Sequence, residues 1–274
     1  MKETLARNIY RYRKESNLTQ EQLGQMLGIS FQAVSKWENA QTMPDISLLP
    51  ELSRILKVST DKLLGYLYED RPVSIYEEVY KTDEYYWGME PNSACYQVLQ
   101  WMPPSRYLRL LDIGCGEGKD AVFFARNGYH VTAMDISDAG ISKTRKLADR
   151  WGVKVETHKA DILDYRLQSF YDIIYSSGVL HYIAQESRTE ILNNYKKFTN
   201  KQGMHIMNVF VDKPFIAPPP EHEENAYAWH SGELITHYRD WQIIDSSEVI
   251  FDCTSSGIPH QHAMTKIIAR NMSE

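Results

Sequence analysis

The sequence predicts two domains of different fold class: a small all-α domain, followed by an α/β domain with a doubly wound parallel sheet. Three observations predict this organisation. Short helical patterns follow one another closely up to about residue 66. After residue 80, apolar strand-like runs alternate with helical stretches, which is the pattern of a parallel sheet covered on both faces. One of these runs, LLDI at 110–113, leads directly into a glycine-rich turn.

The change of pattern places the domain boundary in the segment YLYEDRPVSIYEEVY at 66–80. We therefore expect a helical domain over 1–66, a linker over 67–80 and the α/β domain over 81–274. The chain of 274 residues is long enough for one small domain and one medium-sized domain.

Charge is distributed unevenly between the two parts. Residues 1–68 contain nine Lys and Arg against seven Asp and Glu, a net charge of +2, whereas the remainder carries −8. A nucleic-acid partner is therefore plausible for the first domain, and the acidic second domain would repel a phosphate backbone.

The composition indicates a protein of the reducing cytoplasm. The three cysteines, Cys95, Cys115 and Cys253, are too few and too scattered for a disulfide framework or a zinc site, so no metal is expected. No apolar run approaches the length of about 18 residues that a membrane helix needs, and the first residues lack the pattern of a signal peptide. We expect no membrane partner.

The segment TQEQLGQMLGISFQAVSKWENA at 19–40 predicts a helix-turn-helix. Thr19 can cap a first helix, and Gln22 stands where a capping box requires it. Gly28 permits a sharp turn, and Ser30 can cap a second helix that fits a major groove.

Residues 5–66 resemble the Cro/XRE family of phage-repressor-type DNA-binding domains, through LTQEQLGQMLGIS, AVSKWENA and LLPELSRILKVSTDKLL. The resemblance implies base-reading positions at Ser30, Phe31, Gln32, Ser35 and Lys36, and phosphate contacts at Gln20 and Asn39. The chemistry agrees, since Gln32 can pair with adenine, Lys36 can donate to guanine and Phe31 can contact a thymine methyl. The alternative is a five-helix module used for protein contact. Such domains usually bind paired half-sites, so a homodimer is a further expectation.

The α/β domain is expected to contain seven strands and four helices. The predicted strands are 107–113, 129–134, 153–158, 171–175, 203–210, 241–251 and 263–269. The predicted helices are 118–127, 138–151, 186–198 and 231–238. The last two strands follow each other without a helix, which predicts an antiparallel pair that closes the sheet.

The turn LLDIGCGEGKD at 110–120 does not have the G-x-G-x-x-G spacing of a dinucleotide site. It contains three carboxylates, Asp112, Glu117 and Asp120, and each would repel a pyrophosphate by roughly 1 kcal/mol or more. S-adenosylmethionine carries no phosphate, and its cationic sulfonium and ammonium suit Asp112 at the end of a strand. This cofactor is therefore favoured over a dinucleotide.

Further positions follow the later strands in order. Asp135 suits ribose hydroxyls, and Ile136 can cover the adenine. Asp161 can accept from the adenine amino group, with Ile162 beside it, and Ser177 would face the reactive end. Together these elements resemble the Rossmann-like class I S-adenosylmethionine-dependent methyltransferases, whose product is S-adenosylhomocysteine. The resemblance implies a cofactor site at Asp112, Gly114, Cys115, Gly116, Asp135, Ile136, Asp161, Ile162 and Ser177.

DNA methylation is disfavoured, although the first domain suggests it. Amino-directed DNA methyltransferases place an Asp/Asn-Pro-Pro-aromatic motif after the fourth strand, where this chain reads SSGVLHY. Cytosine-directed enzymes need a Pro-Cys nucleophile, and no cysteine here follows a proline.

Residues 78–271 resemble the tellurite-resistance methyltransferase (TehB) family, most specifically through YAWHSGELITHYRDWQIIDSSEV. The resemblance implies methyl transfer to tellurite, selenite or selenium-type nucleophiles. Where the family has a proposed cluster of His and Arg, this chain reads FDCTSSGIPHQHAMTKII, without Arg. The catalytic candidates are His181, His260 and His262. The substrate candidates are Tyr86, Trp87, Trp229, His230 and Arg239.

Two functions remain open at this point. The first is a methyltransferase for a small acceptor, fused to a DNA-binding module. The second is a transcription regulator whose methyltransferase-like domain senses S-adenosylmethionine or another ligand without turnover.

Overall fold

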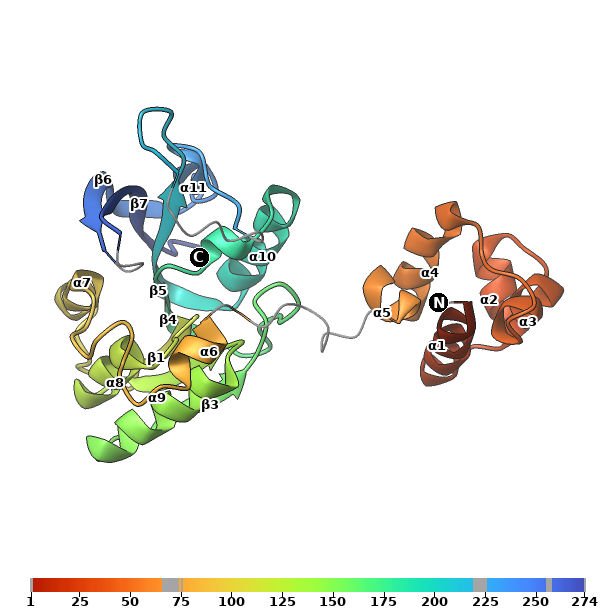
Figure 1. Cartoon of the computed structure of the whole chain (residues 1–274), viewed down its shortest axis with the longest axis horizontal. Helices are drawn as coiled ribbons and strands as arrows, with labels where there is room; N and C mark the ends of the chain where they lie inside the picture. Colours follow the sequence, from red (N-terminus) through yellow and green to blue (C-terminus); the bar gives the residue numbers. More distant parts are fainter. Residues whose placement is uncertain (1, 66–73, 75, 219–225, 255–257, 274) are drawn as a thin grey trace. The chain divides into compact units, whose positions relative to one another are not determined.

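The computed structural model divides the chain into two compact units, Met1–Pro72 and Val73–Glu274 (Figure 1). The structure describes residues 2–65, 74, 76–218, 226–254 and 258–273. Residues 67–73 and 75 of the expected linker, and residue 66 at the end of the expected first domain, lie outside the described residues.

The first unit is a bundle of short helices, which confirms the predicted all-α domain. Its elements are α1 (Lys2–Glu15), α2 (Gln20–Leu27), α3 (Phe31–Glu38), the 3-10 helix η1 (Ile46–Leu48), α4 (Leu49–Leu56) and α5 (Thr60–Leu64). Every α-helix contributes apolar side chains to one core, in which Leu23, Val34 and Leu52 are fully buried.

Helices α2 and α3 form the predicted helix-turn-helix. The Thr19 hydroxyl accepts from the N–H of Gln22, and the Gln22 side chain accepts from the N–H of Thr19, which completes the capping box. Gly28 follows α2 with a φ of 67°, a left-handed conformation that glycine adopts without strain. Ser30 caps α3 by accepting from the N–H of Ala33. The local chemistry therefore sets the turn.

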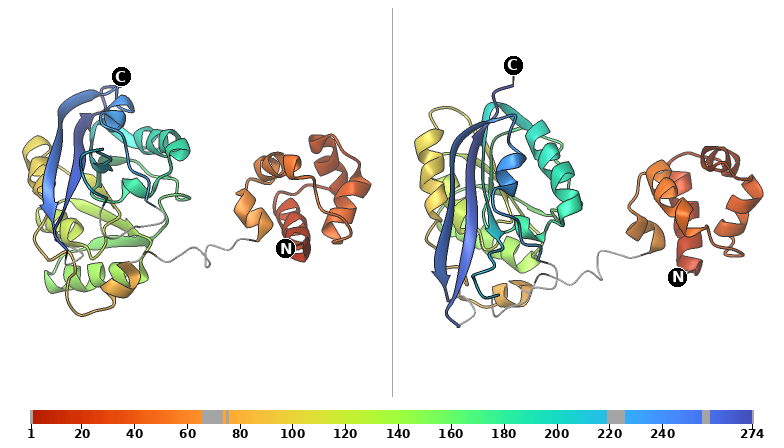
Figure 2. Two further views of the ribbon diagram at one scale, coloured as in Figure 1. Left: turned by 45° about the horizontal axis from the view of Figure 1, so that its top comes forward. Right: turned by 90° about the horizontal axis from the view of Figure 1, so that it is seen from above.

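The second unit is built on a seven-stranded sheet in the order β3-β2-β1-β4-β5-β7-β6. Its strands are β1 (Arg109–Ile113), β2 (His130–Asp135), β3 (Val155–Lys159), β4 (Tyr171–Ser176), β5 (Thr199–Val211), β6 (Gln242–Cys253) and β7 (His260–Arg270). Strands β1 to β5 pair in parallel, whereas β7 is antiparallel to both β5 and β6. Each strand corresponds to a predicted run, and the long β6–β7 pair closes one edge as predicted (Figure 2).

Helices cover both faces of this sheet, which confirms the doubly wound α/β class. They are α6 (Tyr76–Tyr80), α7 (Ser93–Trp101), α8 (Lys119–Arg126), α9 (Asp138–Arg150), the 3-10 helix η3 (Leu180–Tyr182), α10 (Gln185–Lys197) and α11 (Glu233–Thr236). Residues of α7, α8 and α9 share one core with the sheet, and residues of α10 and α11 share another. Among the described residues, no helix has both the length and the apolar character that a membrane span requires.

The helices differ from the prediction in three respects, the first of which is that α7 was not predicted. The helix predicted over 231–238 is shorter, because Tyr238 leaves α11 to bury its ring and to share a hydrogen bond with His205 (2.8 Å). Helix α6 lies within the segment predicted as a linker. Its Glu77 accepts from the hydroxyl of Ser137 (2.5 Å), and this contact ties α6 to the start of α9.

Candidate functional site

The glycine-rich turn after β1 forms a tight backbone cradle. Gly114 and Gly116 have φ values of 72° and 52°, which strain any residue with a Cβ. A Cβ at Gly114 would lie 2.6 Å from the side chain of Val179. The N–H groups of Gly114 and Cys115 donate to the carbonyl of Met134, at 2.8 and 3.0 Å. The turn is thus fixed to the end of β2, and Cys115 contributes its backbone to it.

Asp135, the last residue of β2, holds the same turn through its side chain. Its Oδ2 accepts from the N–H of Gly116 (2.8 Å), and its Oδ1 accepts from the N–H of Ser137 (2.9 Å). Burial raises the pKa of this carboxyl, and the two backbone hydrogen bonds oppose the rise. Each carboxylate oxygen has a second lone pair, so Asp135 retains the capacity to accept from a ribose. Ile136 follows it and is half-buried.

Asp112, near the end of β1, has a buried oxygen without a donor. The residue is only 2% exposed. Among the described residues, none donates a hydrogen bond to its Oδ2. Burial raises the pKa of Asp112 well above its usual range, and repulsion from Asp120 adds to the rise. A cationic group placed at Oδ2 would supply the missing donor and favour the ionised carboxylate.

The other two carboxylates of the turn are engaged inside the protein. Glu117 forms a buried ion pair with Lys143 (2.7 Å). Asp120 is paired with Lys119 (3.0 Å). Their charges are therefore partly neutralised, so these two carboxylates repel a phosphate less than was expected from the sequence. Asp112 is the carboxylate that most strongly disfavours a pyrophosphate.

The residues that follow β3 and β4 lie at the same edge as Asp135, because the carboxyl ends of parallel strands meet there. Asp161 is half-buried, and its Oδ1 accepts from the N–H of Leu163 (2.8 Å). Ile162 is a core residue with 7% exposure, so it offers little surface to an adenine, contrary to expectation. The hydroxyl of Ser177 accepts from the side-chain amide of Asn208 (2.9 Å), which fixes the loop after β4.

Four aromatic side chains gather beside the glycine turn. The rings of Tyr86 and Trp87, two of the expected substrate residues, pack edge to face with centroids 4.8 Å apart. Tyr76 contacts Trp87 (5.4 Å), and the indole N–H of Trp87 donates to the hydroxyl of Tyr80 (2.8 Å). A Cβ at Gly116 would lie 3.0 Å from that hydroxyl. The cluster therefore adjoins the cradle, with Trp87 42% exposed.

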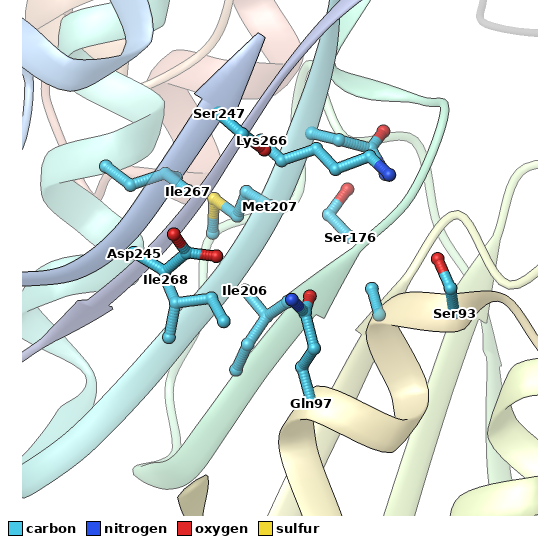
Figure 3. A pocket seen from close by; sticks show the side chains of 12 residues that line it. Ser93, Gln97, Ser176, Ile206, Met207, Asp245, Ser247, Lys266, Ile267 and Ile268 are labelled. Atoms are coloured by element: carbon cyan, nitrogen blue, oxygen red, sulfur yellow. The ribbon is translucent and has the colours of Figure 1, made fainter. Parts of the chain in front are cut away.

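A cavity of about 270 Å³ lies between α7 and strands β5, β6 and β7 (Figure 3). Its polar lining includes Lys266, Asn208, Ser176 and Asp245. Lys266 and Asn208 are register partners on β7 and β5. The Ser176 hydroxyl is buried, and no described residue forms a hydrogen bond with it. The cavity thus offers a cation and two further donors to a small polar molecule.

Two of the candidate histidines meet on one aromatic ring. His181, in η3 after β4, and His262, on β7, both contact Phe210, with ring centroids 5.1 and 4.9 Å from that of Phe210. Burial and the charge of His262 lower the pKa of His181 to about 4, so its ring is neutral near pH 7. No described residue forms a hydrogen bond with the buried Nδ1 of His181. His260 adjoins His262, with their Nε2 atoms 2.8 Å apart.

Trp229, expected as a substrate residue, is part of the core. It is fully buried, and its indole N–H donates to the carbonyl of Leu180 (3.2 Å). The guanidinium of Arg188 lies 4.1 Å from its ring centroid. His230 follows Trp229 and is exposed. Burial therefore assigns Trp229 a packing role.

Arg239 lies away from the other candidates. It stands shortly before β6, whose first residue pairs with Arg270 at the end of β7. Arg270 in turn pairs with Met204 in the first half of β5. Arg239 is therefore near the amino edge of the parallel strands, opposite the glycine turn, and the expectation that it helps to line the acceptor site is wrong.

Helix α3 of the first unit presents the residues that the Cro/XRE resemblance assigns to bases. Phe31 is 51% exposed, and Gln32 and Lys36 are exposed as well. Val34 and Trp37 lie on the opposite side of the helix and are buried, as predicted. The polar face of α3 is thus available to a partner.

The remaining residues of this surface take part in local hydrogen bonds. Ser30 uses its hydroxyl as the cap of α3. The side-chain amide of Asn39 donates to the carbonyl of Ser35 (2.9 Å). The amide of Gln20 donates to Glu38 (2.7 Å), which orients Gln20 at the start of α2. These contacts position the side chains without excluding a phosphate or base contact.

Three residues near these sites, Lys266, Asn208 and Cys253, were not expected from the sequence. Lys266 and Asn208 are far apart in the chain, and only the pairing of β7 with β5 brings them together. Cys253 is the register partner of His260 across β6 and β7. The C-x6-H-x-H spacing, which lies between the predicted strands 241–251 and 263–269, was a signal for this pair. No metal was expected because the cysteines were counted without the neighbouring histidines.

Family comparisons agree with both units. A family model described as "Tellurite resistance protein TehB" matches residues 75–255, and one described as "Helix-turn-helix" matches residues 9–63. A curated relative, "Probable S-adenosyl-L-methionine-dependent methyltransferase TehB" of Haemophilus influenzae, is 25% identical over 140 residues, which cover 51% of this chain and 48% of that protein. The chain spans about half the length of the curated relatives it matches.

Solved structures share the fold. The crystal structure of TehB from Haemophilus influenzae matches with a TM-score of 0.59 and 20% identity, over 73% of this chain and 66% of that chain. The N-methyltransferase NodS from Bradyrhizobium japonicum, in complex with S-adenosylhomocysteine, matches with a TM-score of 0.58 and 16% identity, over 74% and 100% of the two chains. At 16–20% sequence identity, these matches show a shared fold only.

Proposed function

Because the chain belongs to the tellurite resistance protein TehB family, we propose that its second unit is an S-adenosylmethionine-dependent methyltransferase for a small molecule or a metalloid oxyanion such as tellurite or selenite. The observation that carries the proposal is the buried Oδ2 of Asp112, to which no described residue donates. Asp112 lies two residues before Gly114, the first glycine of a turn so tightly packed that a Cβ there would clash with Val179. Such a site suits a ligand that brings its own cation.

The residues of the cradle fit the cofactor. Asp112 would accept from its ammonium group, and Asp135 from its ribose hydroxyls. Ile136 would cover the adenine, and Asp161 would accept from the adenine amino group. Gly116 has a positive φ and would place a Cβ against the Tyr80 hydroxyl, so the turn favours glycine there. When bound, S-adenosylmethionine supplies a methyl group on a positively charged sulfur.

The cavity beside Ser176 supports a small polar acceptor. Lys266 provides a positive charge, and the Asn208 amide and Ser176 hydroxyl provide further donors for an oxyanion. In-line methyl transfer needs no covalent residue, so the task of the chain is to hold the acceptor and to exclude water. His181 is neutral near pH 7, but its lowered pKa makes it a weak base, so we assign it no proton transfer.

A methyl-transfer assay with labelled methyl donor tests this function. The acceptors are tellurite, selenite and simple thiols. We expect label transfer to at least one of them, and a tenfold or larger rise in the KM for an oxyanion in Lys266→Met. Lys201→Met, which removes an exposed lysine near the start of β5, is the matched control and should behave like the wild type.

The same assay separates the enzyme from its alternative. Tight binding of S-adenosylhomocysteine without transfer to any acceptor would contradict the enzyme and favour a regulator that senses the cofactor. A change in operator affinity on addition of cofactor, measured on the full chain, would then identify the signal.

For the first unit we propose sequence-specific DNA binding through α3. The exposed face of Phe31, Gln32 and Lys36 supports it, as does the buried face that fixes the helix. An operator selected from random duplexes should lose about 5- to 150-fold in affinity with Gln32→Ala, from about 1–3 kcal/mol per base contact. Gln25→Ala on α2 is the control, since it removes an exposed glutamine outside α3. Equal losses in both variants would contradict base reading by α3. Homodimerisation stays a prediction.

A further inference from the structure

Cys253, His260 and His262 form a cluster where β6 ends and β7 begins. Cys253 and His260 are register partners in the antiparallel pair, so their side chains lie on one face of the sheet. His262 follows two residues later, and the alternation of a strand places it on the same face. One ligand atom from each residue lies within 4.8 Å of the others. The fold thus gathers a thiol and two imidazoles that the sequence separates.

His260 is already oriented as a ligand. Its Nδ1 lies 2.8 Å from the carbonyl oxygen of Ile258. A carbonyl only accepts, so Nδ1 carries the hydrogen, and the Nε2 of the neutral ring carries the lone pair. That Nε2 is directed at His262, at 2.8 Å. Histidines that bind metals are usually fixed by such a hydrogen bond from the other ring nitrogen to a carbonyl or carboxylate.

The surroundings of the cluster favour ion binding. All three residues are half-buried, so an ion from solvent can reach them. The rings of Phe210 and Phe251 flank His262, at 4.9 and 5.7 Å between centroids. Apolar neighbours restrict water on that side, which strengthens the interaction of a charge with its ligands.

We infer that Cys253, His260 and His262 bind one divalent cation of the zinc class. A thiolate with two imidazoles is a donor set that Zn²⁺ prefers, whereas Mg²⁺ and Ca²⁺ prefer oxygen ligands. Zinc bonds of about 2.0–2.3 Å place tetrahedral ligand atoms roughly 3.3–3.8 Å apart. Because the two Nε2 atoms are 2.8 Å apart in the observed cluster, metal binding would require the side chains to rotate slightly.

Three protein ligands leave the fourth position of a tetrahedral ion open, as in catalytic rather than structural zinc sites. That position can take water or an anionic ligand. His262 and His181 pack on the same Phe210 ring, so the ion would lie on the side of the sheet where the acceptor is proposed. It would then supply a positive charge close to the proposed acceptor. This last role rests on the proposed function, whereas metal binding itself does not.

The test measures zinc binding by the full chain without an affinity tag. Protein stripped with a chelator is titrated with Zn²⁺ in competition with a chromophoric chelator, and bound zinc is counted by mass spectrometry. We expect one zinc per chain, and an affinity at least tenfold lower in Cys253→Ser and in His262→Gln. Gln261→Ala is the matched control, because Gln261 lies between the two histidines on the opposite face of β7. It should bind zinc like the wild type.

Wild-type affinity in both ligand variants would overturn the inference, and so would the lack of a stoichiometric zinc site in the wild type. A second measurement needs no variant. Co²⁺ bound to the wild type should show a thiolate-to-cobalt charge-transfer band with intense tetrahedral ligand-field bands, and an octahedral spectrum without the charge-transfer band would contradict it. Neither readout depends on methyl transfer, so failure of the metal site is distinguishable from failure of the proposed function.

Discussion

The backbone N–H of Gly116 donates a hydrogen bond of 2.8 Å to Oδ2 of Asp135, which joins the glycine turn after β1 to the end of β2. Through this contact the same carboxylate shapes the cradle and stands at its rim. The turn and the carboxylate are therefore coupled, and a change in either should affect ligand binding.

The first prediction concerns Asp135→Ala. Loss of the carboxylate removes the acceptor that shapes the turn and the proposed ribose contact. We expect binding of S-adenosylhomocysteine to weaken by about 10- to 100-fold, which corresponds to hydrogen bonds to a charged group. Asp138→Ala, which removes an exposed carboxylate three residues later, is the control. Calorimetric titration measures both, and equal affinities in the two variants would contradict the assigned role.

The second prediction compares two glycines with positive φ. In Gly152→Ala the new Cβ meets no atom within 4 Å, so the substitution causes only backbone strain. We expect it to lower the free energy of unfolding by about 1 kcal/mol and to leave ligand affinity unchanged. Ala at Gly114 meets Val179 at 2.6 Å, so the turn must shift. Ligand affinity should then fall at least tenfold. Denaturant unfolding and calorimetry provide the two readouts. Retained affinity in Gly114→Ala would show that the cradle does not hold the ligand.

The third prediction concerns the buried ion pair between Lys143 and Glu117. Lys143→Met leaves Glu117 buried without its cation, and such a loss costs about 3–5 kcal/mol of unfolding free energy. Lys159→Met breaks the exposed pair with Asp138 and should cost less than about 1 kcal/mol. Urea unfolding of the two variants measures both losses of unfolding free energy. Similar small losses would mean that Glu117 is solvated.

The fourth prediction is a fall in stability with acid. The pKa of His181 is lowered to about 4 by burial, below its ordinary value of 6.5. Above pH 6.5 the ring is neutral in both states, and it contributes no pH dependence. Between pH 6.5 and 4 the unfolded chain takes up a proton that the folded chain resists, so stability falls by roughly 2–3 kcal/mol and then levels off.

His181→Gln should reduce this slope, and the exposed His130→Gln should leave it unchanged. Some slope should remain in His181→Gln, because burial also lowers the pKa of His205, to about 3. Unfolding free energies at a series of pH values measure the effect. An identical slope in the wild type and His181→Gln would contradict the burial of a neutral ring.

Most of the fold was predictable because its signals are local. The capping box of Thr19 and Gln22 marked the start of α2. Short apolar runs, most of them separated by helical stretches, marked all seven strands. Helices α6 and α7 were not predicted. Helix α6 is held by contacts with residues far away in the sequence. One example is the hydrogen bond that Glu77 accepts from the Ser137 hydroxyl.

The site was predictable only in part. Glycines and strand-end carboxylates marked the cradle, since their positions follow from the local chain. Whether a carboxylate points into the site depends on its partners, and the sequence does not show that Lys143 engages Glu117. Lys266 and Asn208 meet only through strand pairing, and burial alone distinguishes Trp229 from a surface residue.

The most direct test of the account is calorimetric titration of the full chain with S-adenosylhomocysteine and, in parallel, with NAD⁺. The account predicts one S-adenosylhomocysteine bound per chain and no measurable binding of NAD⁺, because the buried carboxylate of Asp112 suits a ligand with an ammonium group and repels a pyrophosphate. Binding of NAD⁺, or lack of binding of S-adenosylhomocysteine, would contradict it.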